Sequence, residues 1–132
     1  MKLIKLPVSF KDERGVIVDL IQDENINAVT ILTFVKGAVR ANHYHKKTFQ
    51  WNYLISGKIR IVTKVLGKKL KKVIMNPGDF ILTVPNERHA LEGIQKSLLL
   101  VLTKGPRGGQ NYESDTYRLD VPLIPFKNKK LI

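Results

Sequence analysis

The sequence predicts an all-β fold, either a closed barrel or a double-sheet jelly roll, from two observations. Short segments rich in β-branched and aromatic residues recur along the chain with turn residues between them, which is typical of strands. No apolar stripe of helical periodicity runs longer than about two turns. About nine closely spaced strands of this length favour a barrel or two packed sheets.

Turn residues divide the chain into these strands in order. Glycine, proline and asparagine mark the breaks because they adopt the backbone angles of tight turns, at Lys36-Gly37, Ser56-Gly57, Leu66-Gly67, Asn76-Pro77-Gly78 and Pro85-Asn86-Glu87. The predicted strands are Gly15–Leu20, Ala28–Val35, Ala41–His45, Phe49–Ile55, Lys58–Val65, Lys68–Met75, Asp79–Val84, His89–Gly93 and Ser97–Thr103.

The length of 132 residues predicts one domain, since this is the usual size of a single hydrophobic core. We expect residues 1–132 to form that domain, with a barrel core at about 10–103 and a less regular tail at 104–132 that wraps the barrel. The chain has no cysteine, so a metal site would need histidine, carboxylate or amide ligands.

Two further features predict a cytoplasmic protein that does not enter a membrane. The absence of cysteine fits a reducing compartment, and the segment Met1–Pro7 lacks the continuous apolar core of a signal peptide. The longest apolar run, Leu98–Leu102, is far too short to span a bilayer.

The chain is strongly basic, with 23 Lys and Arg against 11 Asp and Glu and a net charge of +12. Such a charge favours anionic partners. The lysine clusters at Lys64–Lys72 and Lys127–Lys130 lack the aromatic or arginine interleaving of nucleic-acid sites. Two interpretations stay open: a solvated lysine-rich surface, and attraction of an anionic small molecule such as a phosphorylated one.

All three histidines fall in two short segments that a barrel can bring together. His43 and His45 are two residues apart on a predicted strand, so both side chains point to one face, and His89 begins a later strand. A single His-x-His pair is more often a polar face turned to water. The placement of every histidine of the chain in such positions favours a site.

The spacing around these histidines resembles the cupin family. Gly37, five residues, His43-Tyr44-His45, four residues, Gln50, six residues and Gly57 reproduce the first cupin motif except that glutamine replaces its acidic residue. Gly78 precedes His89 by eleven residues, as in the second motif. The resemblance implies a jelly-roll barrel, a double-stranded β-helix, in which His43, His45, Gln50 and His89 converge in one pocket. In typical cupins the residues at these positions bind a metal.

The sequence resembles one branch of the cupin family more closely. The stretch Arg40–Gln50 looks like the histidine motif of nucleotide-sugar 3,4-ketoisomerases, and Phe10–Gly15 is similar to the Asp-x-Arg-Gly segment of these enzymes and of dTDP-sugar 3,5-epimerases. This resemblance implies an isomerase of carbohydrate biosynthesis that needs no cofactor and acts on a nucleotide-linked keto sugar.

Such a reaction moves a carbonyl group between neighbouring carbons and needs a base and an acid, which imidazole supplies near neutral pH. We expect His43 and His45 to be this catalytic pair, with the assignment between them open. Arg14 and Arg40 would donate hydrogen bonds to the diphosphate or to a developing enediolate, or each would form a surface ion pair. Gln50 and His89 would also contact the substrate.

The strand Phe49–Ile55 alternates, which places Gln50 and Asn52 inside and leaves a row of apolar residues on the outer face. The row consists of Phe49, Trp51, Tyr53 and Ile55. Either it belongs to a homodimer interface, where aromatic residues are enriched, or the C-terminal tail covers it. Tyr44, on the face opposite the histidines, is expected to pack rather than react.

Two other functions remain open. One is a metal-dependent cupin, a dioxygenase or a phosphosugar isomerase, in which His43, His45, Gln50 and His89 hold a divalent transition metal. The other is a sugar-binding cupin without catalysis.

Overall fold

The computed structural model describes residues 1–106 and 114–126. All of the regular secondary structure in these residues is β-strand, which confirms the predicted all-β class. The strands are β1 (Lys2–Ile4), β2 (Phe10–Asp12), β3 (Gly15–Ile17), β4 (Ala28–Phe34), β5 (Val39–Tyr44), β6 (Phe49–Ser56), β7 (Ile59–Lys64), β8 (Lys71–Met75), β9 (Phe80–Thr83), β10 (Arg88–Gly93), β11 (Ser97–Lys104) and β12 (Tyr117–Arg118).

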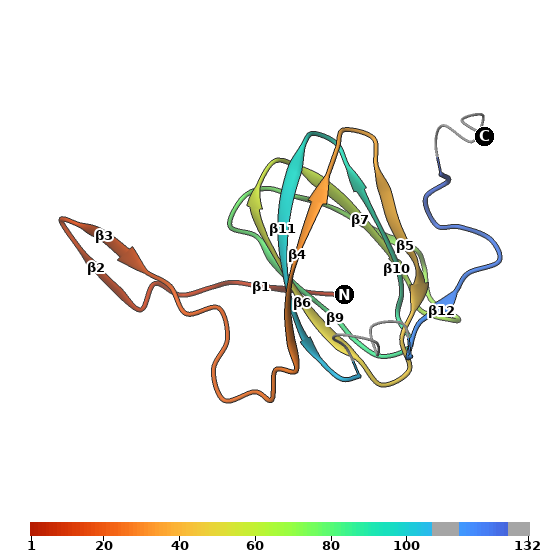
Figure 1. Ribbon diagram of the computed structural model, residues 1–132, viewed down its shortest axis with the longest axis horizontal. Helices are drawn as coiled ribbons and strands as arrows, with labels where there is room; N and C mark the ends of the chain where they lie inside the picture. The colour runs from red at the N-terminus through yellow and green to blue at the C-terminus, as the bar shows by residue number, and fades with distance from the viewer. Residues whose placement is uncertain (107–113, 127–132) are drawn as a thin grey trace.

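Two five-stranded antiparallel sheets form the barrel (Figure 1). The strand orders are β1-β9-β6-β11-β4 and β12-β5-β10-β7-β8. Apolar side chains from both sheets meet between them, among them Phe34, Leu54, Ile61, Leu91 and Leu99. Each is at least nine-tenths buried, and burial of one such side chain stabilises a fold by about 1.5–3 kcal/mol. The core therefore holds the sheets in fixed positions around the site.

Three strands were not expected from the sequence. β1 pairs with β9, β2 pairs with β3, and β12 pairs with β5. β1 and β12 lie outside the predicted core of 10–103 and extend the two sheets. The predicted strand Lys68–Met75 starts only at Lys71, because residues 65–70 form the connection between β7 and β8.

The backbone of β5 is irregular just before the histidines. Ala41 and Asn42 have φ angles of 72° and 58°, and the register between β5 and β10 shifts at His89/Ala90. This bulge is held by the buried Asn42 side chain, whose Oδ1 accepts hydrogen bonds from the amides of Leu123 (2.8 Å) and Ile124 (3.2 Å). Asparagine tolerates the left-handed region better than most residues, so residue 42 both bends the strand and binds the tail.

Gly57, the last glycine of the first motif, lies where the chain turns from β6 into β7. Its φ is 94°, and a Cβ atom there would collide with the Ser97 side chain and the Lys96 carbonyl. Only glycine fits this close approach.

Trp51, in the apolar row on the outer face of β6, is covered by the N-terminal part of the same chain, whereas Ile55 at the end of the row is 41% exposed. Trp51 is 6% exposed and lies in a cluster with Phe80 and Leu102. The residues that pack over this cluster include Ile4, Leu6, Leu20, Ile21 and Ile26. At Trp51 this corrects the expectation that a second copy or the C-terminal tail covers the row, while the homodimer itself stays a prediction.

The tail instead packs on the other sheet. Ile124 is buried against Val62 and Ala90, so the part of the tail at 114–126 does lie against the barrel.

The lysine cluster at 64–72 forms an exposed hairpin end and the edge strand β8. Charged edge strands resist pairing with other chains, which favours the interpretation of a solvated surface. The second cluster, Lys127–Lys130, lies outside the described residues. Among the residues that the structure describes, no helix could cross a membrane.

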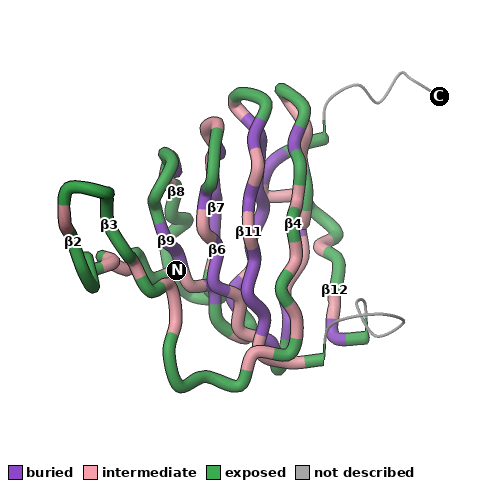
Figure 2. The backbone as a smooth tube through the Cα atoms, turned by 60° about the vertical axis from the view of Figure 1, so that its left-hand side comes forward, coloured by how far each residue is buried: buried purple, intermediate pink, exposed green. Residues whose placement is uncertain are grey.

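The β2–β3 hairpin projects away from the barrel (Figures 1 and 2). Its side chains Phe10, Val16 and Ile17 are 51%, 55% and 57% exposed.

Candidate functional site

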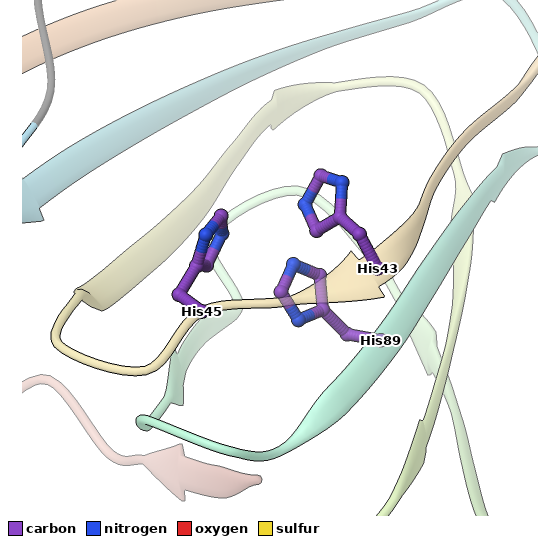
Figure 3. A group of neighbouring side chains, drawn as sticks. All are labelled: His43, His45 and His89. Atoms are coloured by element: carbon purple, nitrogen blue, oxygen red, sulfur yellow. The ribbon is translucent and has the colours of Figure 1, made fainter. Parts of the chain in front are cut away.

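The three histidines form one cluster inside the barrel, as the sequence predicts. His43 is on β5, His45 directly follows β5, and His89 is on β10 opposite His43. The ring centroids of His43 lie 4.7 Å from those of both His45 and His89, and His45 and His89 are 5.2 Å apart (Figure 3). Three imidazoles thus point into a common space.

His89 is held as a neutral ring. Its Nδ1 lies 3.1 Å from the Glu87 carbonyl oxygen, which can only accept, so Nδ1 carries the proton and Nε2 does not. Burial, with the charge of His45 as a smaller cause, lowers the pKa of His89 from 6.5 to about 3. At neutral pH this residue therefore offers a lone pair rather than a proton.

His45 is contacted on both of its nitrogen atoms. Nδ1 donates to the backbone carbonyl of Asp115 at 2.8 Å, and Nε2 lies 3.1 Å from Oε1 of Gln50. With Nδ1 protonated, the neutral ring has its lone pair on Nε2. The Gln50 amide can donate to that lone pair after rotation or accept from a protonated ring, since it has both a donor and an acceptor end.

The carboxylate of Asp115 anchors the chain next to His45. It accepts hydrogen bonds from the amides of Lys46 (3.1 Å) and Lys47 (2.8 Å) and from the Thr48 hydroxyl (2.8 Å). Burial alone would raise the pKa of Asp115, but these three donors and the charge of His45 outweigh it and keep that pKa below its ordinary value.

A cavity of about 190 Å³ opens beside the cluster. Its deep wall is apolar and includes Leu32, Ile61, Leu91, Leu99 and Val101. Its polar lining consists of Arg40, His43, Gln50, Asn52, Thr83, His89, Thr116 and Arg118. Gln50 and Asn52 both line it, as the alternation of this strand predicts.

The two arginines predicted to bind substrate lie in different places. Arg40 lines the cavity, and its Nε and Nη2 donate to the Thr33 carbonyl at 3.2 Å and 2.9 Å. Arg14 is on the projecting hairpin, 81% exposed, in an ion pair of 2.6 Å with Asp12. It does not line the cavity of its own chain, so its role in binding stays a prediction.

Sequence reasoning missed three residues of the site, Asp115, Thr116 and Arg118. They come from the C-terminal tail, where β12 runs beside β5 with Arg118 opposite His43. No periodicity or motif marks this segment in the sequence, so only its long-range pairing reveals it.

The donor set is chemically suited to a divalent transition metal. The three histidines offer ligand atoms that all lie within 4.8 Å of one another, and neutral imidazoles are good ligands for such ions. His89 and His45 each donate Nδ1–H to a backbone carbonyl, the outer contact that usually orients a metal-binding histidine. Gln50 would supply an uncharged oxygen in place of the usual carboxylate. A bound ion would act as a Lewis acid on a substrate oxygen.

The family model described as cupin domain matches residues 30–102. No curated protein sequence matches the chain. Among solved structures, a double mutant of the 3,4-ketoisomerase QdtA from Thermoanaerobacterium thermosaccharolyticum in complex with TDP is 26% identical. The match covers 89% of this chain and 86% of that one, with a TM-score of 0.73.

Two further structures show the same fold. A QdtA mutant in complex with TDP-4-keto-6-deoxyglucose is 24% identical over 89% of this chain and 86% of that one, with a TM-score of 0.74. The dTDP-4-dehydrorhamnose 3,5-epimerase from Sulfolobus tokodaii is 17% identical over 93% and 79%, with a TM-score of 0.71. From the matched domain and its two histidine motifs, this chain is a member of the cupin family.

Proposed function

We propose that the protein is a sugar-nucleotide isomerase or epimerase, similar to the 3,4-ketoisomerases, that works by histidine acid/base chemistry. One observation carries this proposal: the three histidines cluster with their ligand atoms within 4.8 Å of one another, and two of them, His43 and His89, line a cavity whose described lining contains no carboxylate. Imidazole suits proton transfer near neutral pH, so these histidines are the proposed acid/base groups. The likeness to 3,4-ketoisomerases and a 3,5-epimerase supports a keto sugar as the substrate.

The reaction follows from the groups present. One of His43 and His45 removes the proton from the carbon next to the carbonyl, and the C–H electron pair forms the C=C bond of an enediol as the carbonyl oxygen gains a proton. Loss of the proton from the neighbouring hydroxyl and return of a proton to the first carbonyl carbon complete the shift of the carbonyl. Return to the original carbon from the other face gives epimerisation instead.

The size of the cavity supports a particular position for the substrate. About 190 Å³ is smaller than the volume that usually encloses a whole drug-sized ligand, about 300 Å³ or more. One sugar ring would enter, and the nucleoside diphosphate would lie towards the surface, where Arg40 and Arg118 offer bidentate donors to phosphate. The net charge of +12 would steer such an anion to the protein.

We also propose that the protein is a cytoplasmic homodimer, with the β2–β3 hairpin in the interface. An isolated two-stranded hairpin is marginal in water, and this one exposes Phe10, Val16 and Ile17. Pairing with a second copy would cover them. Substrate binding by Arg14, two residues beyond the end of β2, is proposed for that assembly.

The test is incubation with TDP-4-keto-6-deoxyglucose followed by NMR of the sugar. The expected product is the 3-keto isomer or a C3 or C5 epimer, formed by the wild type and lost in His43→Asn. A Tyr44→Phe variant, altered on the opposite face of the strand, is the control and should stay active. No conversion of this or related TDP-linked keto sugars would overturn the proposal.

A metal-dependent cupin is the second candidate, because the histidine ligand atoms cluster within 4.8 Å. Elemental analysis of protein purified without added metal or chelator decides between the two. About one transition metal per chain, lost in a His43→Ala/His89→Ala double variant, would favour this candidate and reject the metal-free reaction.

A further inference from the structure

We propose that Asp115 is the positioning residue of the site: it sets the tautomer and the orientation of His45 through its own carbonyl and locks that carbonyl through its carboxylate. This inference rests on the proposed function for its kinetic consequence, whereas its structural part can be tested on its own.

The carbonyl of Asp115 determines which nitrogen of His45 carries the proton. A backbone carbonyl only accepts hydrogen bonds, and it lies 2.8 Å from Nδ1. The Nδ1–H form is therefore favoured, and Nε2 is left for the side facing Gln50 and the cavity. The other tautomer would place an unprotonated Nδ1 against the carbonyl oxygen, and a ring turned over would place a carbon there, so either change would lose this bond.

The carboxylate of the same residue prevents the carbonyl from moving. Asp115 is 4% exposed and accepts three hydrogen bonds from consecutive residues, the amides of Lys46 and Lys47 and the hydroxyl of Thr48. Because these residues directly follow His45, one side chain joins the tail to the backbone that carries the imidazole. Hydrogen bonds to a charged acceptor are stronger than those between neutral groups, so this link is strong for a single residue.

The same link places the tail against the cavity. Beyond Asp115 the chain enters β12. The Tyr117 ring of this strand stacks on Tyr44 with ring centroids 5.3 Å apart. The Lys46 ammonium lies over the Tyr117 ring, 4.3 Å from its centroid. Thr116 and Arg118, on the other side of this short strand, line the cavity. Asp115 thus couples the orientation of His45 to the position of two residues at the mouth.

The experiment compares Asp115→Ala and Asp115→Asn with a matched control, Asp120→Asn. Asp120 lies in the same tail segment, is exposed and carries the same charge, so the control separates loss of charge from loss of the anchor. Thr48→Val is a milder variant that removes one of the three donors without changing the volume of a buried side chain. Thermal unfolding followed by circular dichroism verifies that each variant is folded.

The decisive measurement is the tautomer of His45, read from the ¹⁵N resonances of its two ring nitrogens at neutral pH. The wild type and Asp120→Asn should show protonated Nδ1 and unprotonated Nε2. Asp115→Ala should show a mixture of tautomers, and Asp115→Asn and Thr48→Val should fall between. A wild type with its proton on Nε2, or an Asp115→Ala variant with the wild-type pattern, would overturn the inference.

Kinetics with TDP-4-keto-6-deoxyglucose supply the second readout. A misoriented acid/base group should lower kcat at least about tenfold while KM changes less than about twofold, since general acid/base catalysis is worth about 10²–10⁴. An equal loss in Asp120→Asn would contradict the assignment. If the wild type itself has no activity, the proposed function fails, while the tautomer measurement still decides the role of Asp115.

Discussion

At the scale of single residues, three chemically identical side chains are given different properties by their surroundings. His89 is buried, donates Nδ1–H to the Glu87 carbonyl and has its pKa lowered to about 3. His45 is held between the Asp115 carbonyl and the Gln50 amide, and His43 lines the cavity. This difference among the histidines matters because isomerisation requires some groups that exchange protons and others whose protonation state does not change.

Replacement of either member of the proposed catalytic pair should remove activity without unfolding the protein. We expect His43→Asn and His45→Asn each to lower kcat by about 10²-fold or more, the usual range for loss of a general acid or base. Steady-state kinetics of product formation measures this, with circular dichroism as a check of the fold. Activity within a few-fold of the wild type in both variants would instead indicate the sugar-binding cupin without catalysis.

His89 makes stability depend on pH in a predictable direction. Its pKa is 6.5 when exposed and about 3 in the folded protein, so between these values the unfolded chain binds the proton and the folded chain does not. Stability is therefore complete above pH 6.5 and falls as the pH decreases from 6.5 towards 3.

Urea unfolding at pH 7.5, 6 and 5 measures this effect. The wild type should lose stability across the series, by an amount on the order of 1 kcal/mol per pH unit below 6.5. His89→Gln, which cannot titrate there, should lose less. Parallel curves for the two proteins would show that His89 is not held neutral.

At the scale of elements, sequence patterns locate the regular strands but not the segments defined by distant partners. The alternation in β6 correctly places Gln50 and Asn52 at the cavity, and turn residues mark most strand ends. β1 and β12 have only 3 and 2 residues, too few to show a period, and they exist because β9 and β5 supply partners. Asp115 was missed for the same reason, since its function depends on contacts about 70 residues away along the chain.

The burial of Trp51 shows a second limit of prediction from sequence. Its position on the outer face of the strand was predicted from alternation, but the N-terminal segment that covers it has no regular secondary structure between Leu20 and Ile26. A residue can therefore be assigned to a face from sequence, whereas what packs on that face depends on the path of a loop.

The β2–β3 hairpin is the element on which the proposed dimer depends. We expect Phe10→Ser with Ile17→Ser to shift the protein from dimer to monomer, because both side chains are about half exposed in one chain and would be buried between two. Analytical ultracentrifugation measures the mass. Val121→Ser, which alters a side chain that is 80% exposed elsewhere, is the control and should leave the mass unchanged. A monomeric wild type would reject the dimer.

At the scale of the whole molecule, the fold and the histidine cluster were accessible from the sequence because they depend on dense local signals. Two motifs with fixed spacing specify where His43, His45 and His89 lie relative to turns, and the two sheets then bring β5 and β10 side by side. The mouth of the cavity was not accessible, since Thr116 and Arg118 reach it from the tail. The sequence therefore predicts the histidine cluster better than the tail residues that line the cavity.

In the proposed function, His43 and His45 remove a proton from the carbon next to a sugar carbonyl. The most direct test is incubation of the metal-free protein with TDP-4-keto-6-deoxyglucose in D₂O, with NMR detection of deuterium at the carbons beside the carbonyl. We predict enzyme-dependent incorporation that is abolished in His43→Asn/His45→Asn, even if the final product differs from the expected one. Incorporation at the rate of a sample without protein would show that these histidines do not remove the proton.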